Sequence, residues 1–267
     1  MIPHGHIIAA SPSYRTPQDR RTSILPPTIS FYIGMIAVVF RGAHLARRGR
    51  YDDQAWIDSS IDIMNALERA GVRLNIDGME HLHELDGPAV FIANHMSTLE
   101  TFTLPGLIHP VRRCTFVIKP SLMDYPVFKH VMRSRNPVVV SRDNPRQDLV
   151  TVLEEGARRL EQGTSIVLFP QTTRTPVFDP AQFNTLGVKV AKKAGVPAVP
   201  VALKTDTWEN GRMLKDFGPV LPERPVHIRF GAPMDITGNG REQHEAIVAF
   251  ITEHLGRWRD EEPGAPA

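Results

Sequence analysis

The sequence has a single cysteine, Cys114, among its 267 residues. One cysteine cannot form a disulfide bond within the chain, and its scarcity excludes four-cysteine zinc sites and iron–sulfur clusters. So little cysteine fits a reducing compartment. Because Cys114 begins an apolar run of β-forming residues, we interpret it as a core residue and not as a nucleophile.

Several patterns of well-known enzyme classes are also missing from the sequence. There is no Gly-x-Ser-x-Gly stretch, which disfavours a serine hydrolase with a nucleophile elbow. The glycine patterns of Rossmann and P-loop proteins are absent, which disfavours a nucleotide enzyme of either kind. Two histidine pairs, His4 with His6 and His81 with His83, have the composition of metal ligands. Both pairs fall in an expected tail or loop, so we expect no metal site.

Acidic residues are nearly absent from the first 50 residues. This segment has seven arginines and one acidic residue, so its net charge is +6, while the remainder is −4 and the whole chain is +2. A basic front before a mildly acidic body predicts contact with a polyanionic surface, either nucleic acid or membrane. Few aromatic residues lie between these arginines and the adjacent run is apolar. We therefore favour an anionic membrane surface and expect no nucleic-acid partner.

An uncharged run lies between Arg21 and Arg41. Pro26 and Pro27 favour a helix start rather than a helix interior. A helix over residues 28–40 would rise about 20 Å, less than the roughly 30 Å of a bilayer core. We therefore predict a helix that lies in or dips into the membrane interface, with arginines near anionic head groups. The alternative is a buried core helix whose basic last turn complements the helix dipole. One face of this helix would carry Ile29, Ile33, Ile36 and Phe40.

The pattern along the chain divides it into four segments. Residues 1–22 are polar and contain prolines, which predicts a flexible tail and not a cleaved signal peptide. Residues 23–71 predict an N-terminal helical hairpin, because a second helical pattern runs from 53 to 69 and Gly71 ends it. The other segments are an α/β domain, residues 72–259, and a second short tail, residues 260–267.

Strand patterns alternate with helical patterns over residues 72–259. This alternation predicts an α/β fold with a mainly parallel sheet flanked by helices, preceded by a two-helix membrane-associating hairpin. In such sheets, sites gather at the carboxyl ends of the strands. Strands are expected at 73–76, 89–93, 115–118, 137–140, 165–169, 198–203 and 226–230, and helices at 97–107, 148–161, 186–194 and 242–257.

The first chemically informative stretch follows the expected strand at residues 89–93. His95 would lie at the carboxyl end of this strand, and Glu100 in the first turn of the next helix. A histidine held by a carboxylate is the general-base pair of acyl transfer. The carboxylate fixes the tautomer, and the other ring nitrogen removes a proton from a hydroxyl. The alternatives are that Glu100 forms a capping box with Ser97 and that His95 is an ordinary loop histidine.

The second stretch, residues 169–175, follows another expected strand. It supplies three threonine hydroxyls and the planar fork of Arg174, which suit a phosphate or a carboxylate. A polar turn is the alternative. Lys119 and Arg142 also follow expected strands, so three cations could converge on one anion at the same edge of the sheet. Three separate solvated charges are the alternative.

With these stretches, the chain resembles the lysophospholipid acyltransferase family, the 1-acylglycerol-3-phosphate acyltransferases, over about residues 74–235. Four blocks occur in the order of the family. The block at 94–100, Asn-His-Met-Ser-Thr-Leu-Glu, is similar to the His-x4-Asp motif, and Phe-Pro-Gln-Thr-Thr-Arg at 169–174 is similar to Phe-Pro-Glu-Gly-Thr-Arg. The other two blocks are Lys119-Pro120-Ser121-Leu122, with Pro126 and Val140-Ser141-Arg142 after it, and Gly195-Val196-Pro197-Ala198-Val199-Pro200-Val201.

The resemblance implies a membrane-associated enzyme of phospholipid biosynthesis. It would move a fatty acyl group from acyl-CoA or an acyl carrier protein to the free hydroxyl of a lysophospholipid, giving phosphatidic acid from lysophosphatidic acid. His95 would be the base and Glu100 its orienting carboxylate. No metal and no cofactor beyond the acyl carrier would be needed. The enzyme would sit at the cytoplasmic face of a membrane, peripheral or monotopic. Lys119, Arg142 and Arg174 would bind the phosphate, and Gln171, Thr172, Thr173, Val196 and Pro197 would contact substrate.

Two departures from the family pattern concern the site. Glu100 stands where the family has Asp, which keeps the charge on an arm longer by one methylene. Gln171 and Thr172 stand where the family has Glu and Gly, which removes a negative charge beside the proposed phosphate site. The acceptor could therefore be another hydroxyl-bearing lipid. The alternative from a different class is a non-catalytic membrane lipid-binding protein.

Overall fold

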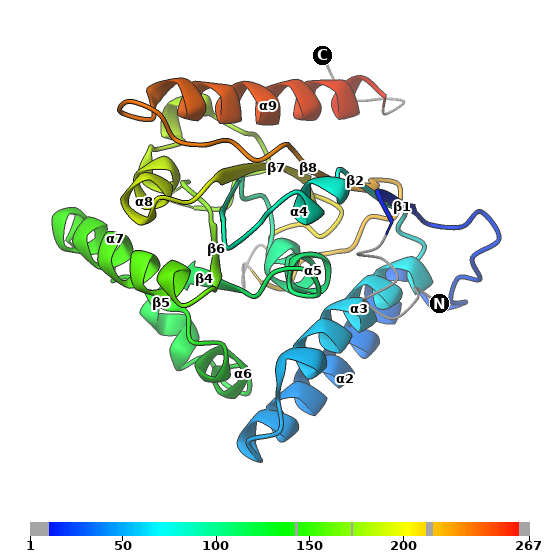
Figure 1. Ribbon diagram of the computed structural model, residues 1–267. Helices are drawn as coiled ribbons and strands as arrows, with labels where there is room; N and C mark the ends of the chain where they lie inside the picture. Colours follow the sequence, from blue (N-terminus) through cyan, green and yellow to red (C-terminus); the bar gives the residue numbers. More distant parts are fainter. Residues whose placement is uncertain (1–10, 142–143, 172, 212–215, 262–267) are drawn as a thin grey trace.

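A central eight-stranded sheet organises the chain in the computed structural model, which describes residues 11–141, 144–171, 173–211 and 216–261 (Figure 1). The strand order is β1-β2-β8-β7-β3-β6-β4-β5. The strands are β1 (Ser13–Arg15), β2 (Leu74–Asp77), β3 (Val90–Ala93), β4 (Cys114–Ile118), β5 (Val138–Val139), β6 (Ser165–Leu168), β7 (Ala198–Lys204) and β8 (Val226–Phe230).

The sheet is mixed but mainly parallel, as the alternation of strand and helix patterns predicted. Strands β3, β4, β5, β6 and β7 form a continuous parallel block. Strand β8 runs antiparallel to β7, and β1 runs antiparallel to β2. The parallel block places the carboxyl ends of β3, β4 and β6 at one edge of the sheet, and the informative sequence stretches follow these strands.

Helices cover both faces of the sheet, so the central strands are apolar on both sides. Phe91 and Ala93 of β3 belong to a core shared with α2, α3 and α5, while Val90 and Ile92 belong to a second core shared with α7, α8 and α9. The helices are α2 (Pro27–Arg47), α3 (Asp53–Arg69), α4 (Glu80–His83), α5 (Leu99–Ile108), α6 (Lys129–Ser134), α7 (Pro145–Glu161), α8 (Leu186–Ala194) and α9 (Arg241–Asp260), with short 3-10 helices η1 (Pro120–Met123) and η2 (Pro180–Gln182).

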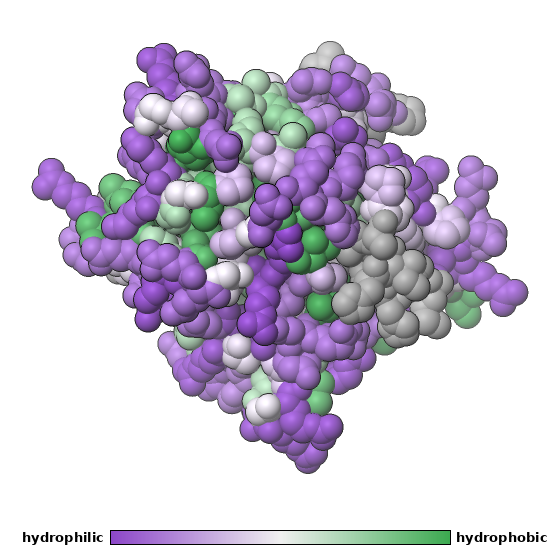
Figure 2. Space-filling model, viewed as in Figure 1, coloured by the Kyte–Doolittle hydropathy of each residue, from purple (hydrophilic) through white to green (hydrophobic). Residues whose placement is uncertain are grey.

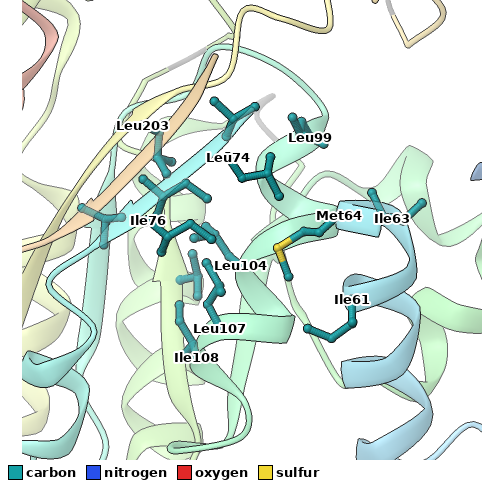
Figure 3. Close-up of a cluster of buried hydrophobic side chains, with 14 of the residues drawn as sticks. Ile61, Ile63, Met64, Leu74, Ile76, Leu99, Leu104, Leu107, Ile108 and Leu203 are labelled. Carbon is teal, nitrogen blue, oxygen red and sulfur yellow. The ribbon is translucent and has the colours of Figure 1, made fainter. Parts of the chain in front are cut away.

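The first core joins the N-terminal helices to the sheet. Figure 3 shows Ile61 and Met64 of α3 beside Leu104 of α5, with Ile76 of β2 on the sheet side. Helices α3 and α5 approach closely because Gly106 has no side chain: a Cβ there would lie 2.8 Å from the Cβ of Ser60. The helix that carries Glu100 is thereby fixed between α3 and the sheet.

Helix α2 is longer than the sequence predicted. It begins at Pro27, as the proline pair indicated, but continues through Phe40 to Arg47. The argument that this helix is too short to cross a membrane is therefore wrong. By length and composition alone, α2 is the one described helix that could do so. Charged residues did not end the helix because its second half packs through Gly42 and Ala43, which are buried.

Helix α3 lies beside α2 and runs back along it (Figure 1). Asp52 caps its start by accepting a hydrogen bond from the Ala55 N–H at 2.9 Å. Gly71, with φ of +92°, follows its end. Only α2 is apolar enough for a membrane, so the two helices do not by themselves establish the predicted membrane-associating hairpin. Four large apolar side chains of α2 are 46–60% exposed, namely Ile29, Ile33, Ile36 and Phe40.

The second half of the predicted flexible tail is ordered, which corrects that prediction. Ser13–Arg15 pair with β2 as an edge strand. Tyr14 and Thr16 then donate hydrogen bonds to the buried carboxylate of Glu68 at 2.6 and 2.8 Å. Arg20 forms an ion pair with the same carboxylate at 3.1 Å. The sequence did not predict this order because the partners of the segment are distant in the chain. Its strand has three residues, which is too few to show the alternation of apolar and polar residues that marks a strand.

We expect Arg20→Ala to destabilise the fold by about 2–3 kcal/mol, because it leaves the buried Glu68 charge without its cation. Urea unfolding followed by circular dichroism measures this loss. Arg21→Ala is the matched control, since Arg21 is exposed and adjacent. Equal stability of the two variants would contradict the structural role of Arg20.

Candidate active site

His95 and Glu100 form a directly hydrogen-bonded pair at the carboxyl end of β3. The Nδ1 atom of His95 lies 2.5 Å from Oε2 of Glu100. The Glu100 side chain is fully buried, and the His95 side chain is 17% exposed. An ionised carboxylate only accepts hydrogen bonds, so the neutral imidazole holds its proton on Nδ1 and leaves Nε2 as the basic nitrogen. The two residues meet because α5 begins directly after the strand, as the sequence spacing predicted.

The second oxygen of Glu100 is held by three donors. The backbone N–H groups of Met96 and Ser97 each donate to Oε1 at 2.9 Å, and the Thr205 hydroxyl donates to it at 2.5 Å. The backbone bonds are those of a helix-capping carboxylate, and Oε2 meanwhile holds His95. The capping and orienting interpretations of Glu100 are therefore both correct. Thr205 escaped the sequence analysis because it lies 105 residues away along the chain.

Residues after β6 hold the other side of His95. Its ring stacks on Phe169, with centroids 4.2 Å apart and planes inclined by 13°. Its backbone N–H donates to Oε1 of Gln171 at 2.7 Å, and its carbonyl accepts from the Thr175 N–H at 3.0 Å. The amide of Gln171 also donates to the Thr175 hydroxyl at 3.0 Å.

These contacts give Gln171 a structural role, and its predicted contact with substrate stays a prediction. Gln171 is buried, and its amide both accepts from His95 and donates to Thr175. The Thr175 hydroxyl in turn donates to the Val177 carbonyl at 2.8 Å. A glutamate at position 171 would have no N–H for Thr175 and would require that hydroxyl to turn away from Val177. Gln171 is thus matched to its neighbours. Thr173 is exposed, and Thr172 lies outside the described residues.

Arg174 lies beside the first turn of α5. Its guanidinium forms an ion pair with Asp216 at 2.8 Å and also donates to the hydroxyl of Thr98. Thr98 donates to the same carboxylate at 3.1 Å. Thr98 is two residues before Glu100, so Arg174 is close to the histidine–carboxylate pair. Asp216 was not predicted, because nothing in its local sequence marks it as a partner of Arg174.

Of the two other predicted phosphate ligands, the structure describes Lys119 alone. Lys119 is exposed and follows β4, whose carboxyl end lies at the same sheet edge as His95. Arg142 lies outside the described residues. The convergence of Lys119, Arg142 and Arg174 on one anion stays a prediction.

The structure places Val196 and Pro197, which were predicted to line the substrate pocket, away from His95. They precede β7, and the Pro197 carbonyl accepts from the N–H of Val90, the first residue of β3. His95 follows the opposite end of β3. Because β3 and β7 are parallel, Val196 and Pro197 lie at the far edge of the sheet from His95. Their family block marks the start of a buried strand, and sequence resemblance cannot show which end of that strand faces the site.

Neither Cys114 nor His81 is hydrogen-bonded to the His95–Glu100 pair. Cys114 is buried in β4, and burial strongly raises the pKa of its thiol, which confirms the core interpretation. His81 pairs with Glu84 at 2.8 Å on the surface, and His4 and His6 lie outside the described residues. In the described ranges, no group of three or more His, Cys, Asp or Glu side chains could hold a metal ion.

Comparison with known proteins agrees with this arrangement. The family model named Acyltransferase matches residues 73–204, which include His95, Glu100, Lys119 and Arg174. The chain is 31% identical over 233 residues to 1-acyl-sn-glycerol-3-phosphate acyltransferase of Pseudomonas aeruginosa, covering 85% of this chain and 83% of that protein. The chain belongs to the lysophospholipid acyltransferase family. It is therefore an acyltransferase, which disfavours the non-catalytic alternative.

Two further proteins extend the comparison of this acyltransferase. A chloroplastic relative, 1-acyl-sn-glycerol-3-phosphate acyltransferase LPAT1 of Arabidopsis thaliana, is 29% identical over 172 residues. This match covers 62% of the chain but only 46% of the relative. The crystal structure of PlsC, the 1-acyl-sn-glycerophosphate acyltransferase from Thermotoga maritima, superposes with a TM-score of 0.62 at 20% identity, covering 89% of this chain and 97% of that chain. The α/β sheet with flanking helices is thus shared with PlsC.

Proposed function

We propose that this acyltransferase moves a fatty acyl group from a thioester carrier to the free hydroxyl of lysophosphatidic acid, giving phosphatidic acid. The observation that carries the proposal is the His95–Glu100 pair with its basic Nε2 at the carboxyl edge of the sheet. The names of the relatives, which specify 1-acyl-sn-glycerol-3-phosphate as their acceptor, support it. The carrier is acyl-CoA or acyl carrier protein, and both use the same thioester chemistry.

The proposed reaction needs only the residues of this site. Nε2 of His95 takes the proton of the acceptor hydroxyl while its oxygen attacks the thioester carbonyl carbon. The negative charge of Glu100 stabilises the imidazolium that forms. The carbon–sulfur bond then breaks, the ester remains on the acceptor, and the imidazolium returns its proton to the leaving thiolate. No covalent acyl-enzyme and no metal enter these steps.

Arg174 is the proposed ligand of the acceptor phosphate, together with Lys119 and Arg142. The ion pair between Arg174 and Asp216 bears directly on this role. A phosphate would have to compete with the Asp216 carboxylate for the guanidinium. Both groups are oxyanions that can bind a guanidinium through two oxygens. An acceptor without a phosphate monoester would leave this ion pair intact. The identity of the acceptor head group is therefore decided by experiment.

A direct assay tests the proposed function. The purified protein is incubated with a mixture of lysolipids and with acyl-CoA or acyl carrier protein in parallel, and the diacyl products are identified by mass spectrometry. The expected product is phosphatidic acid. Product from another lysolipid alone would reassign the acceptor, and no product from any pair would refute acyl transfer to a lysolipid.

We propose that the reaction takes place at the cytoplasmic face of a membrane, with the enzyme peripheral or monotopic, and the α2 surface supports the membrane association. Its exposed isoleucines and Phe40 form an apolar face, and Arg47, Arg48 and Arg50 are exposed where α2 ends. Hydrophilic residues cover that tip of the molecule, at the bottom of Figure 2. An apolar helix face with basic residues at one end is typical of interfacial binding. The lysolipid acceptor resides in the same interface.

We expect the triple variant Arg47→Glu, Arg48→Glu, Arg50→Glu to bind anionic liposomes at least about tenfold more weakly than wild type. Arg41 is left unchanged because it pairs with Asp62. Sedimentation with vesicles containing phosphatidylglycerol measures the binding. The matched control reverses the exposed Lys189, Lys192 and Lys193 of α8, which lies away from α2 (Figure 1). Equal loss in both variants would show a general charge effect and contradict docking through α2.

A further inference from the structure

The Thr205 hydroxyl joins the catalytic pair from a distant part of the chain. Thr205 follows β7 and is completely buried. It donates to Oε1 of Glu100 at 2.5 Å and accepts from the Ser97 hydroxyl at 3.0 Å. The Ser97 oxygen in turn accepts from the Leu99 N–H at 3.1 Å. Because a carboxylate can only accept, the direction of each bond in this chain is fixed.

The donors to Glu100 are not equivalent. Met96 and Ser97 donate through backbone N–H groups in the same turn as His95, so their bonds move with that turn. Among the described residues, Thr205 is the donor that comes from outside residues 95–100. It ties the carboxylate to β7, and Asn94 ties the turn to the same strand through two bonds with Leu203, at 2.7 and 2.8 Å.

The longer side chain of Glu100 makes an outside donor valuable. A glutamate has one more rotatable bond than an aspartate, so fixing Oε2 toward His95 requires a firm hold on Oε1. The carboxylate is also fully buried, so the loss of any of its hydrogen bonds would leave a buried polar atom unsatisfied. Thr205 supplies both the hold and the hydrogen bond.

We propose that Thr205 is a positioning residue of the reaction: its hydroxyl fixes the Glu100 carboxylate so that Oε2 holds His95 in the reactive tautomer and orientation. The kinetic consequences of this inference rest on the proposed function. The geometry is independent of that function, because the hydrogen bonds of Thr205 and His95 with Glu100 define it.

Thr205→Val tests the inference, because valine keeps the shape of threonine and removes the hydroxyl. We expect kcat to fall about 10- to 100-fold while the KM values for both substrates stay within about threefold. Thr205→Ser restores the hydroxyl and is expected to recover most of kcat. In the Glu100→Gln background, Thr205→Val should add little further loss, because the two residues act as one unit.

Thr207→Val is the matched control. Thr207 is also completely buried, and its hydroxyl donates to the Leu221 carbonyl at 2.8 Å, away from the catalytic pair. Thermal unfolding of all variants separates lost positioning from lost folding. Wild-type kcat in Thr205→Val, failure of Thr205→Ser to recover kcat, or an equal loss in Thr207→Val would overturn the inference.

A spectroscopic measurement decides the inference even if wild-type protein proves inactive toward every lysolipid, which would refute the proposed function alone. The Nδ1 proton of His95, in its short hydrogen bond, gives a proton NMR signal assignable by its absence in His95→Ala. We expect Thr205→Val to shift or broaden this signal and Thr207→Val to leave it unchanged. An unshifted signal in Thr205→Val would overturn the positioning role.

Discussion

Replacing His95 with alanine is expected to lower the rate of acyl transfer at least about a thousandfold, because the hydroxyl of the acceptor then has no base. The other groups that contact His95 offer no equal substitute: they are the Glu100 carboxylate, whose Oε1 is held by three other donors, the Phe169 ring, the Gln171 amide and the Thr175 backbone. The assay is transfer of a labelled acyl group from acyl-CoA to lysophosphatidic acid in detergent micelles, so membrane docking does not limit the rate.

Glu100→Gln provides a second test of the same pair. The carboxamide keeps the size of the side chain but places either an N–H or an uncharged oxygen opposite Nδ1 of His95. An N–H there would favour the tautomer with its proton on Nε2, which cannot act as a base. We expect a loss of about a hundredfold or more, and Glu100→Asp should retain part of the activity because it keeps the charge.

His81→Ala is the control for both changes. It removes another histidine that pairs with a glutamate, at 2.8 Å, but on the surface. Wild-type activity in His81→Ala together with the losses above would confirm that position in the fold, and not the pair itself, makes the difference. Activity near the wild-type level in a folded His95→Ala protein would contradict the mechanism.

Replacing Arg174 with alanine is expected to lower kcat/KM for lysophosphatidic acid about a hundredfold, mainly through KM. Two charge-assisted hydrogen bonds to the phosphate would be lost. Asp216, which Arg174 now neutralises, would also face the phosphate without a counter-charge. Arg174→Lys should retain part of the affinity, because a lysine keeps the charge but not the planar fork.

A second acceptor and a second arginine complete this test. Monoacylglycerol carries a free hydroxyl and no phosphate, so its slower acylation should change far less in Arg174→Ala. Asp216→Asn should lower KM for lysophosphatidic acid several-fold by removing the competing charge. Arg224→Ala is the control. Arg224 forms an ion pair with Glu209 at 2.8 Å, and both residues lie, like Asp216, in the connection between β7 and β8. An unchanged KM for lysophosphatidic acid in Arg174→Ala would contradict phosphate binding by this residue.

The sequence by itself determined the parts of the molecule that depend on nearby residues. Short β-branched runs predicted every strand of the parallel block, because the two-sided burial of such strands leaves a nearly continuous apolar pattern. His95 and Glu100 were predicted together because one strand end and one helix start bring them into contact within six residues. The basic front and the apolar face of α2 were also visible in composition and helical spacing.

The tertiary structure decided whatever depends on residues far apart in the chain. Glu68 orders Tyr14, Thr16 and Arg20, which polarity alone indicated as a tail. Parallel pairing moved Val196 and Pro197 to the edge of the sheet opposite His95. Thr205 and Asp216 became partners of Glu100 and Arg174 only when β7 and the segment after it packed beside α5. Local propensity and spacing act over a few residues, whereas a buried charge takes its partners from wherever the folded chain passes.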